Sequence, residues 1–458
     1  MQKDLTQGSI FKNLAVFSLP FFFSYFLQTL YGLADLFIIG QFNGSDSITA
    51  VSIGSQIMHM LTVIIVGLAM GTTVMISRAV GAKKENEVSK AIGNSVTLFA
   101  IVAVLLCVIL IATVSPIVSV MSTPVEAVEQ TKIYLLICFA GIPFIIAYNI
   151  ISAIFRGLGD SKSPMYFVAV ACVINIALDY LFIGVFGMRA AGAALGTVIS
   201  QTISVIFAVI SIAKGRNRIR LSRQNLVPDK LMMGNILKIG LPVSLQDGFI
   251  QVSFIVITII ANSRGVEIAA AVGIVEKIIS MLFLVPSSML SAVSSLAAQN
   301  MGAGEHKRAS RTLEYGIGIT VVFGIFISIL IQFVAKPLIG SFTSDAAVII
   351  FGVQYLKSYV FDCIFAGIHF CFSGYFCAYG KSMYSFIHNV ASILLMRIPG
   401  AYLASIYFPD TLFPMGCAAP AGSLLSALIC LGLFLHMHRN MRGNLHGNMR
   451  GNGALQNQ

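Results

Sequence analysis

Residues 14–40 read LAVFSLPFFFSYFLQTLYGLADLFIIG, and this stretch decides the fold class. A helix needs about 20 apolar residues to cross the hydrocarbon core of a bilayer. This stretch exceeds that length and contains one charged side chain, Asp35. Similar apolar runs follow it along the chain. We predict an all-α integral membrane protein with twelve transmembrane helices, near residues 14–40, 47–77, 91–117, 131–155, 165–186, 193–213, 236–262, 268–296, 312–339, 349–377, 384–407 and 417–436.

The composition of the chain indicates that its solvent is lipid. Of 458 residues, 57% are hydrophobic and 10% are charged, whereas an average soluble domain has about 25% charged residues. The formal net charge of +11 would favour nucleic-acid binding in a soluble protein. Here the basic residues lie in short segments between apolar runs, so we expect no nucleic-acid partner. All 8 cysteines lie inside apolar runs, which predicts packed thiols rather than a disulfide framework.

The basic residues also predict how the chain crosses the membrane. With a cytoplasmic N-terminus, most of the 29 Lys and Arg residues fall on the cytoplasmic side, as the positive-inside rule requires. We therefore expect a multi-pass protein of the inner (plasma) membrane, a monomer, with both termini in the cytoplasm. The predicted parts are a first lobe of six helices at 1–213, a basic cytoplasmic linker at 214–235, a second lobe of six helices at 236–437, and a disordered cytoplasmic tail rich in Gly, Asn and Arg at 438–458.

The two halves of the chain resemble each other at a nearly constant offset. The sequence FSLP at 17–20 aligns with IGLP at 239–242, and the GA pair at 81–82 aligns with the GA pair at 302–303. The YL pair at 180–181 likewise aligns with 402–403. Because each lobe has an even number of helices, both enter the bilayer from the same side. The lobes are thus expected to be related by a pseudo-twofold axis along the membrane normal, with a substrate cavity between them.

Polar side chains within the predicted helices of the first lobe are candidates for function, because a charge at the bilayer centre costs at least about 2.5–3.5 kcal/mol. Asp35 lies in the first helix. Asn175 and Asp179 lie in the fifth, and their i,i+4 spacing places them on one face. An amide oxygen and carboxylates suit Na⁺, and a carboxyl shielded from water can instead hold a proton. The alternatives are that Asp35 meets water at the outer interface and that the other two only form hydrogen bonds between helices.

The second half and the first-helix proline carry further candidates. Within or near its helices lie Gln251, Glu276, Lys277, Asp362, His369 and Arg397. Glu276 adjoins Lys277 and Asp362 could meet Arg397, so structural pairing competes with function here. Pro20 frees a backbone carbonyl and can bend the first helix, either as a static kink or as a hinge.

Other classes of membrane protein lack support in the sequence. The chain has no GxxxxGK[ST] nucleotide-binding motif, which argues against an ATP-driven pump. It has no HExxH or GxSxG motif of an enzyme and no TVGYG potassium filter. We expect no enzyme activity and no cofactor other than a coupling ion.

Taken together, several short motifs resemble the multidrug and toxic compound extrusion (MATE) family of secondary transporters over roughly residues 8–436. The motifs are SLP at 18–20, Asp35 with the following IG at 39–40, SRAVGA at 77–82, FRGLGD at 155–160, GAALGT at 192–197 and AQNMGAG at 298–304. The resemblance implies two six-helix lobes around a V-shaped cavity and antiport of H⁺ or Na⁺ against organic, often cationic and aromatic, compounds.

The resemblance also implies a set of site residues in the first lobe. Family members with a cation site there use a first-helix Asp, an Asn and an Asp on the fifth helix, and a sixth-helix Thr; the matching positions are Asp35, Asn175, Asp179 and Thr197. The first-helix proline linked to bending matches Pro20. Another branch of the family places a Glu in helix 7 and an Asp in helix 10. The corresponding positions here are Gln251 and about Ala366, with Asp362 displaced by one turn, which favours coupling through the first lobe.

From the sequence we therefore expect an antiporter that exports organic, cationic or amphipathic compounds in exchange for H⁺ or Na⁺. Two alternatives stay open at this point. One is a lipid-linked oligosaccharide flippase of related fold, whose cavity would be more cationic than the few basic residues inside these helices allow. The other is a membrane-embedded enzyme, which the missing catalytic motifs disfavour.

Overall fold

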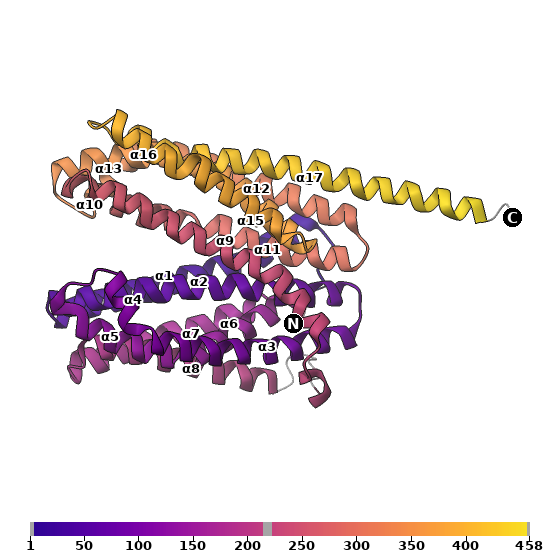
Figure 1. The fold of residues 1–458 in the computed structure, drawn as a ribbon, viewed down its shortest axis with the longest axis horizontal. Coiled ribbons are helices and arrows are strands. Elements are labelled where there is room, and N and C mark those ends of the chain that lie inside the picture. The colour runs from indigo at the N-terminus through magenta and orange to yellow at the C-terminus, as the bar shows by residue number, and fades with distance from the viewer. Residues whose placement is uncertain (1–3, 214–221, 456–458) are drawn as a thin grey trace.

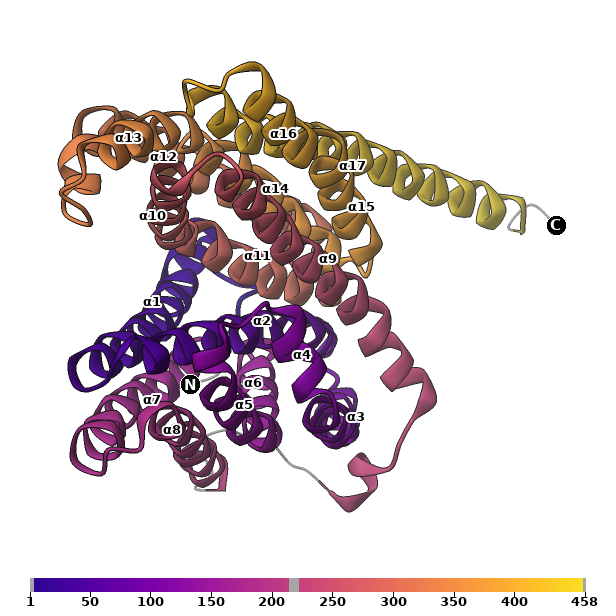
Figure 2. The same cartoon turned by 60° about the vertical axis from the view of Figure 1, so that its left-hand side comes forward.

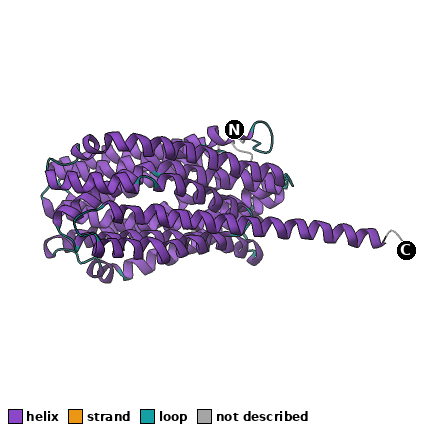
Figure 3. Cartoon of the chain, turned by 90° about the horizontal axis from the view of Figure 1, so that it is seen from above, coloured by secondary structure: helices purple, strands orange, loops and turns teal. Residues whose placement is uncertain are grey.

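The computed structural model describes residues 4–213 and 222–455, and Figure 1 shows their arrangement. Helices joined by short loops make up those residues, and no strand occurs among them (Figure 3). The first half contains α1 (Ile10–Phe42), α2 (Ser45–Gly81), α3 (Glu85–Ala112), α4 (Val114–Val120), α5 (Val125–Ala140), α6 (Ile142–Gly157), α7 (Lys162–Asp179), the π-helical η1 (Tyr180–Val185) and α8 (Arg189–Ala213). The second half contains the 3₁₀ turn η2 (Arg223–Leu226), α9 (Lys230–Asn262), α10 (Val266–Leu282), α11 (Leu284–Gly302), α12 (His306–Gly340), α13 (Ala346–Tyr359), α14 (Asp362–Ala378), α15 (Ser382–Ser392), the π-helical η3 (Ile393–Arg397), α16 (Ile398–Tyr407) and α17 (Phe413–Leu455).

The predicted twelve-helix membrane architecture is confirmed. In the described part of the chain, 10 helical segments are long and apolar enough to cross a membrane. The two bent pairs α5–α6 and α13–α14, with bends of 49° and 42°, bring the number of spans to 12. Many large apolar side chains are exposed on the outside of the bundle, Val104, Phe326 and Phe333 among them. Such a surface is stable only against acyl chains.

The helices form two lobes that lie side by side (Figures 1 and 2). Helices α1–α8 form the first lobe and α9–α17 the second. Each lobe has its own apolar core, and a third buried cluster joins residues of both, with Leu14, Phe17 and Val74 against Ile239 and Leu296. The two bent pairs occupy the fourth span of each lobe, as the internal repeat requires.

The lobes meet closely where α2 passes α11. A Cβ atom on Gly81 would clash with the carbonyl oxygen of Gln299, and a Cβ on Gly302 would clash with the carbonyl oxygen of Arg78. The two glycines are partners in the internal repeat, so the same motif from each lobe packs against its counterpart. Only glycine allows this approach of the two backbones.

Several hydrogen bonds between the lobes lie at the same end of the molecule as this crossing. Arg78 donates from Nε and Nη2 to the carbonyl oxygen of Ala378, at 2.9 and 2.7 Å, where the end of α14 leaves that carbonyl free. The backbone N–H of Leu5 donates to Gln299 Oε1 at 3.2 Å, and Arg308 donates to the carbonyl oxygen of Gly8 at 3.1 Å. The lobes are therefore held together at the end that carries the N-terminus.

Replacing Gly302 with valine is expected to push the lobes apart at this crossing. Overpacking a tight contact costs about 1–3 kcal/mol, and the steric partner here is backbone, which cannot rotate away. We expect a lower melting temperature of the purified protein in detergent. Gly318→Val is the matched control, because a Cβ on Gly318 in α12 meets no atom within 4 Å. Equal melting temperatures for the two variants would contradict this account.

The segment between the lobes docks on α3 and is shorter than predicted. Asp229 caps α9, accepting from the N–H groups of Leu231 and Met232, so the helix begins at Lys230 rather than near residue 236. The backbone N–H of Asp229 donates to Asn94 Oδ1 at 2.7 Å. The Lys90 ammonium holds the pKa of Asp229 below its usual range. Residues 214–221 of the predicted linker lie outside the described residues.

The end of the chain differs from the predicted disordered tail at 438–458. Helix α17 continues to Leu455 and extends beyond the body of the molecule (Figures 1 and 3). Met437 is buried, and His438 Nε2 lies 3.3 Å from Ser310 Oγ, which ties the start of this extension to α12. A helix already formed needs no new nucleus to grow, which favours its continuation through a glycine-rich sequence.

Candidate functional site

The four residues proposed for the first lobe come from three helices that pack together. Asp35 is on α1, Asn175 and Asp179 are on the last turns of α7, and Thr197 is on α8. Asp35, Asn175 and Asp179 are 3%, 1% and 0% exposed, so none of them faces lipid. The alternative that Asp35 simply meets water at an interface is therefore wrong.

Contacts within this group place the carboxyl groups around a common point. Thr197 Oγ1 donates to Asp35 Oδ2 at 3.4 Å. The Asp35 and Asp179 carboxyl groups interact electrostatically across α1 and α7. Gly196 makes room for this arrangement, since a Cβ there would clash with Asp179 Oδ1 and lie 3.7 Å from Asn175 Nδ2.

Several polar atoms of the group have no partner among the described residues. These atoms are Asp35 Oδ1, both carboxylate oxygens of Asp179, and the amide oxygen and nitrogen of Asn175. An unpaired buried polar group costs about 1–3 kcal/mol, more when charged. Two carboxylates that share a buried site also repel each other. Their chemistry fits a proton or a hard monovalent cation such as Na⁺, which prefers oxygen ligands.

A local irregularity in the fifth span adjoins the group. The π-helical segment η1 begins at Tyr180, directly after Asp179. Single π-helical turns inside α-helices occur frequently at functional sites, because they shift the register of the side chains that follow. No sequence pattern predicts this π-helical segment.

Pro20 lies inside α1, which continues as a helix from Ile10 to Phe42. Its ring removes the N–H that would otherwise bond to the carbonyl of Val16. The carbonyl oxygen of Pro20 accepts from Ser24 Oγ at 2.8 Å. Helix α1 thus lacks one backbone hydrogen bond between its N-terminal part, which contacts the second lobe, and the carboxyl group of Asp35.

Replacing Pro20 with alanine is expected to raise the melting temperature and slow transport. Alanine restores one backbone hydrogen bond, and a proline in a helix interior costs about 3 kcal/mol. A hinge role predicts a lower transport rate at unchanged ion affinity, measured as substrate efflux from proteoliposomes. Pro242→Ala, at the equivalent position of α9, serves as the control. It should raise the melting temperature without lowering the transport rate. Full transport by the Pro20 variant would indicate a static kink.

The candidates of the second lobe do not form a site of the same kind. Gln251 on α9 is half-buried, and no hydrogen bond joins it to Asp362 among the described residues. Asp362, at the start of α14, is fully buried and its Oδ2 lies 3.9 Å from Arg397 Nη2. The pairing of Asp362 with Arg397 anticipated from the sequence is therefore present.

One ionisable residue at the contact between the lobes escaped the sequence analysis. Asp247 is half-buried on α9, and its Oδ2 would lie 2.8 Å from a Cβ on Gly67 of α2. The rule that singled out Asp35, a carboxyl group inside an apolar run, applies equally to LPVSLQDGFI at 241–250.

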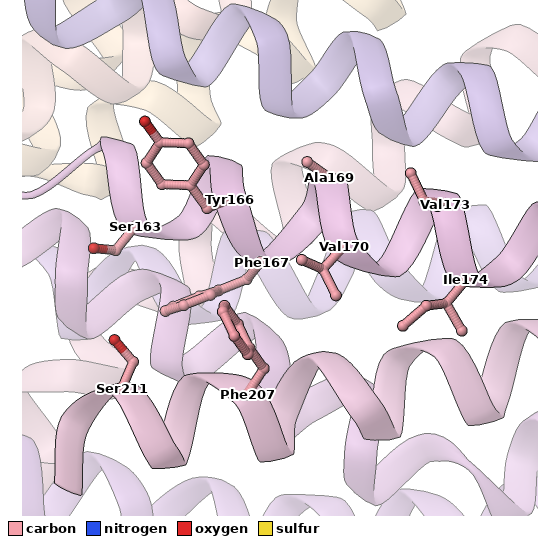
Figure 4. A pocket seen from close by; sticks show the side chains of 9 residues that line it. All are labelled: Ser163, Tyr166, Phe167, Ala169, Val170, Val173, Ile174, Phe207 and Ser211. Atoms are coloured by element: carbon pink, nitrogen blue, oxygen red, sulfur yellow. The ribbon is translucent and has the colours of Figure 1, made fainter. Parts of the chain in front are cut away.

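An apolar groove lies between α7 and α8 on the outside of the first lobe (Figure 4). Tyr166, Val170, Val173 and Phe207 are among the side chains that line it. At 100° per residue, the α7 side chains of the groove lie on the face opposite Asn175. With Val173 and Tyr166 more than half exposed, this groove is a lipid-facing surface that is separate from the polar group.

A two-lobe bundle with twelve spans, an internal repeat and a buried polar group in one lobe defines a multi-pass membrane transport protein. A family model described as MatE matches the chain twice, at residues 20–181 and 242–403. The chain belongs to this family, the MATE efflux transporters, and is a transporter rather than an enzyme.

Curated relatives and solved structures agree with this assignment. A probable multidrug resistance protein, YpnP of Bacillus subtilis, is 30% identical over 88% of this chain and 90% of its own length. The multidrug export protein MepA of Staphylococcus aureus is 26% identical over 82% of this chain and 83% of its own. A multidrug resistance MATE transporter in an outward-facing conformation has a TM-score of 0.88 at 22% identity, covering 95% of this chain and 97% of that one.

Proposed function

We propose that the protein is a secondary active antiporter that exports organic compounds, cationic or amphipathic, in exchange for H⁺ or Na⁺ bound at Asp35, Asn175, Asp179 and Thr197. The single observation that carries the proposal is the set of buried oxygens on Asp35, Asn175 and Asp179 that have no partner among the described residues. A bound proton or cation would satisfy them and reduce the repulsion between the two carboxyl groups. Export driven by the ion gradient follows if ion and substrate favour different conformations of the lobes.

The proposed direction of transport follows from the contacts between the lobes. The positive-inside rule puts the N-terminus on the cytoplasmic side of the membrane, which we propose to be the plasma membrane. The bonds from Arg78 and Leu5 hold the lobes together at that end. This conformation would therefore release substrate toward the outside, and inward-moving ions would reload the site. Because the site lies within one lobe, a single chain suffices for the cycle.

The flippase alternative finds less support in the described residues. A pyrophosphate-linked substrate would need free cationic groups between the lobes. Arg397 donates to Tyr359 Oη at 2.6 Å and pairs with Asp362, so its charge is already engaged. An organic cation is better matched by the aromatic and methionine side chains of the spans.

The proposal is tested with the purified protein in proteoliposomes that contain a fluorescent organic cation such as ethidium. A sodium gradient and a pH gradient are imposed separately, each with the other ion held equal across the membrane. We expect one of the two gradients to drive movement of the dye and dye movement to dissipate that gradient. Dye movement that is indifferent to both gradients would refute ion-coupled antiport.

A further inference from the structure

The family model gives the register between the lobes. Its two matches begin at residues 20 and 242 and end at 181 and 403, which is an offset of 222 at both ends. In this register Asp35 corresponds to Ile257, Asn175 to Arg397, and Asp179 to Ala401. Ile257 and Ala401 are 3% and 1% exposed, so apolar packing replaces both carboxyl groups in the second lobe.

The remaining counterpart, Arg397, carries a buried positive charge. It is the last residue of the π-helical segment η3 in the fifth span of the second lobe. Arg397 is 9% exposed. The guanidinium carbon lies 4.9 Å from the ring centroid of Phe254 on α9, and Nη2 donates to Tyr359 Oη.

Carboxyl groups reach Arg397 from other helices. Asp362 Oδ2 on α14 lies 3.9 Å from Nη2, and neither of its oxygens has a hydrogen-bond partner among the described residues. Glu276 on α10 interacts electrostatically with the same guanidinium, and its Oε1 is likewise unpartnered. The titratable groups that face Arg397 are Glu276 from α10, Tyr355 and Tyr359 from α13, and Asp362 and His369 from α14.

The two lobes thus differ in one charge. Each has two carboxyl groups in a polar cluster: the buried Asp35 and Asp179 in the first lobe, and in the second the buried Asp362 and the half-buried Glu276, which both interact with Arg397. The described part of the first cluster contains no cationic side chain, whereas the second contains a guanidinium, which stays protonated at any physiological pH. A tethered cation at this position removes the need for an ion from solution.

We propose that Arg397 is a built-in cation: in the second lobe its guanidinium takes the place that an exchangeable H⁺ or Na⁺ takes in the first, and it confines ion coupling to the first lobe. The inference rests on the proposed function of the Asp35 site. It predicts that removing the guanidinium converts Asp362 and Glu276 into a second exchangeable site, with two carboxyl groups and no cation, as in the first lobe.

The test uses the full chain with Asp35→Asn and Asp179→Asn combined, so that the first site is silent. Binding of radioactive Na⁺ and proton uptake reported by a pH dye are measured on the purified protein. The Asp35→Asn/Asp179→Asn protein, called the silent background, is expected to bind neither Na⁺ nor H⁺ in these two measurements. Adding Arg397→Met is expected to create binding of about one cation per chain, and adding Asp362→Asn to that variant is expected to abolish it. Lys277→Met is the matched control, because it removes an exposed positive charge beside Glu276 and should create no site.

The outcomes separate this inference from the proposed function. Melting curves establish that each variant is folded, and the Arg397→Met/Asp362→Asn protein, whose charges are better balanced, provides a second folded reference. A folded Arg397→Met protein without new ion binding would overturn the inference, as would ion binding in the silent background that depends on Asp362. Failure of the proposed function would show elsewhere, as undiminished ion-driven transport by Asp35→Asn and Asp179→Asn.

Discussion

Asp35→Asn and Asp179→Asn are each expected to abolish ion-driven export while leaving the protein folded. Asparagine keeps the size of the carboxyl group but can neither release a proton nor contribute negative charge to a bound cation. Coupling between an ion site and a second site is typically worth about 1–3 kcal/mol, which changes the affinity of the second ligand by roughly 5- to 150-fold. Without that coupling the ion gradient can no longer drive export. The measurement is initial efflux of a fluorescent cation from proteoliposomes under an imposed gradient.

The stability of these variants supplies a second readout. Removing one of two buried carboxyl groups relieves their repulsion, and we expect an unchanged or higher melting temperature in the absence of the coupling ion. Asp410→Asn, at an exposed acid, controls for a general change in charge and should transport normally. Wild-type rates for both site variants would remove the coupling mechanism altogether.

Gly196→Val should block the site without changing any charge. A Cβ on Gly196 would clash with Asp179 Oδ1, so the valine side chain occupies the space between α8 and α7 that the carboxyl group requires. We expect ion affinity to fall by at least tenfold, which corresponds to about 1.4 kcal/mol. The measurement is the ion concentration that gives half-maximal transport.

The control for this substitution lies on the neighbouring helix. A Cβ on Gly32 in α1 meets no atom within 4 Å, so Gly32→Val adds the same side chain without touching Asp179. Equal ion affinity in the two variants would show that Asp179 does not take part in ion binding.

Much of the architecture could be predicted from the sequence, because a membrane imposes strong rules. Apolar length set the number of spans, and the repeated motifs, the glycines at 81 and 302 among them, predicted two equivalent lobes. The bend within the α5–α6 span lies at Gly141 and Pro143, which favour a helix break. The bend within the α13–α14 span has no Gly or Pro at the break and depends on how the helices pack. The helix that continues past residue 438 was not predicted, because a glycine-rich composition disfavours helix. That argument takes no account of the transmembrane helix that precedes these residues and continues into them.

The polar group of the first lobe was accessible from the sequence for a different reason. The i,i+4 spacing of Asn175 and Asp179 fixes their common face on any helix, and Asp35 stood out as the one charge in the first apolar run. The family resemblance supplied Thr197. The role of Gly196 was not accessible, because it comes from the distance between two helices. Asp247 satisfies the same rule as Asp35, a carboxyl group inside an apolar run, and was overlooked. The hydrogen bond from Arg397 to Tyr359 could not be predicted, because it depends on how α13 packs against its neighbours.

The position of the N-terminal segment has a practical consequence for work with this protein. Leu5 is 1% exposed, its N–H bonds to Gln299, and Arg308 holds the carbonyl of Gly8. A purification tag or fluorescent fusion placed ahead of Leu5 would lie against the junction of the two lobes and would shift the equilibrium between conformations of the two lobes. Fusions after α17, which projects away from the bundle (Figure 1), leave that junction free and are the better choice for binding and spectroscopic assays.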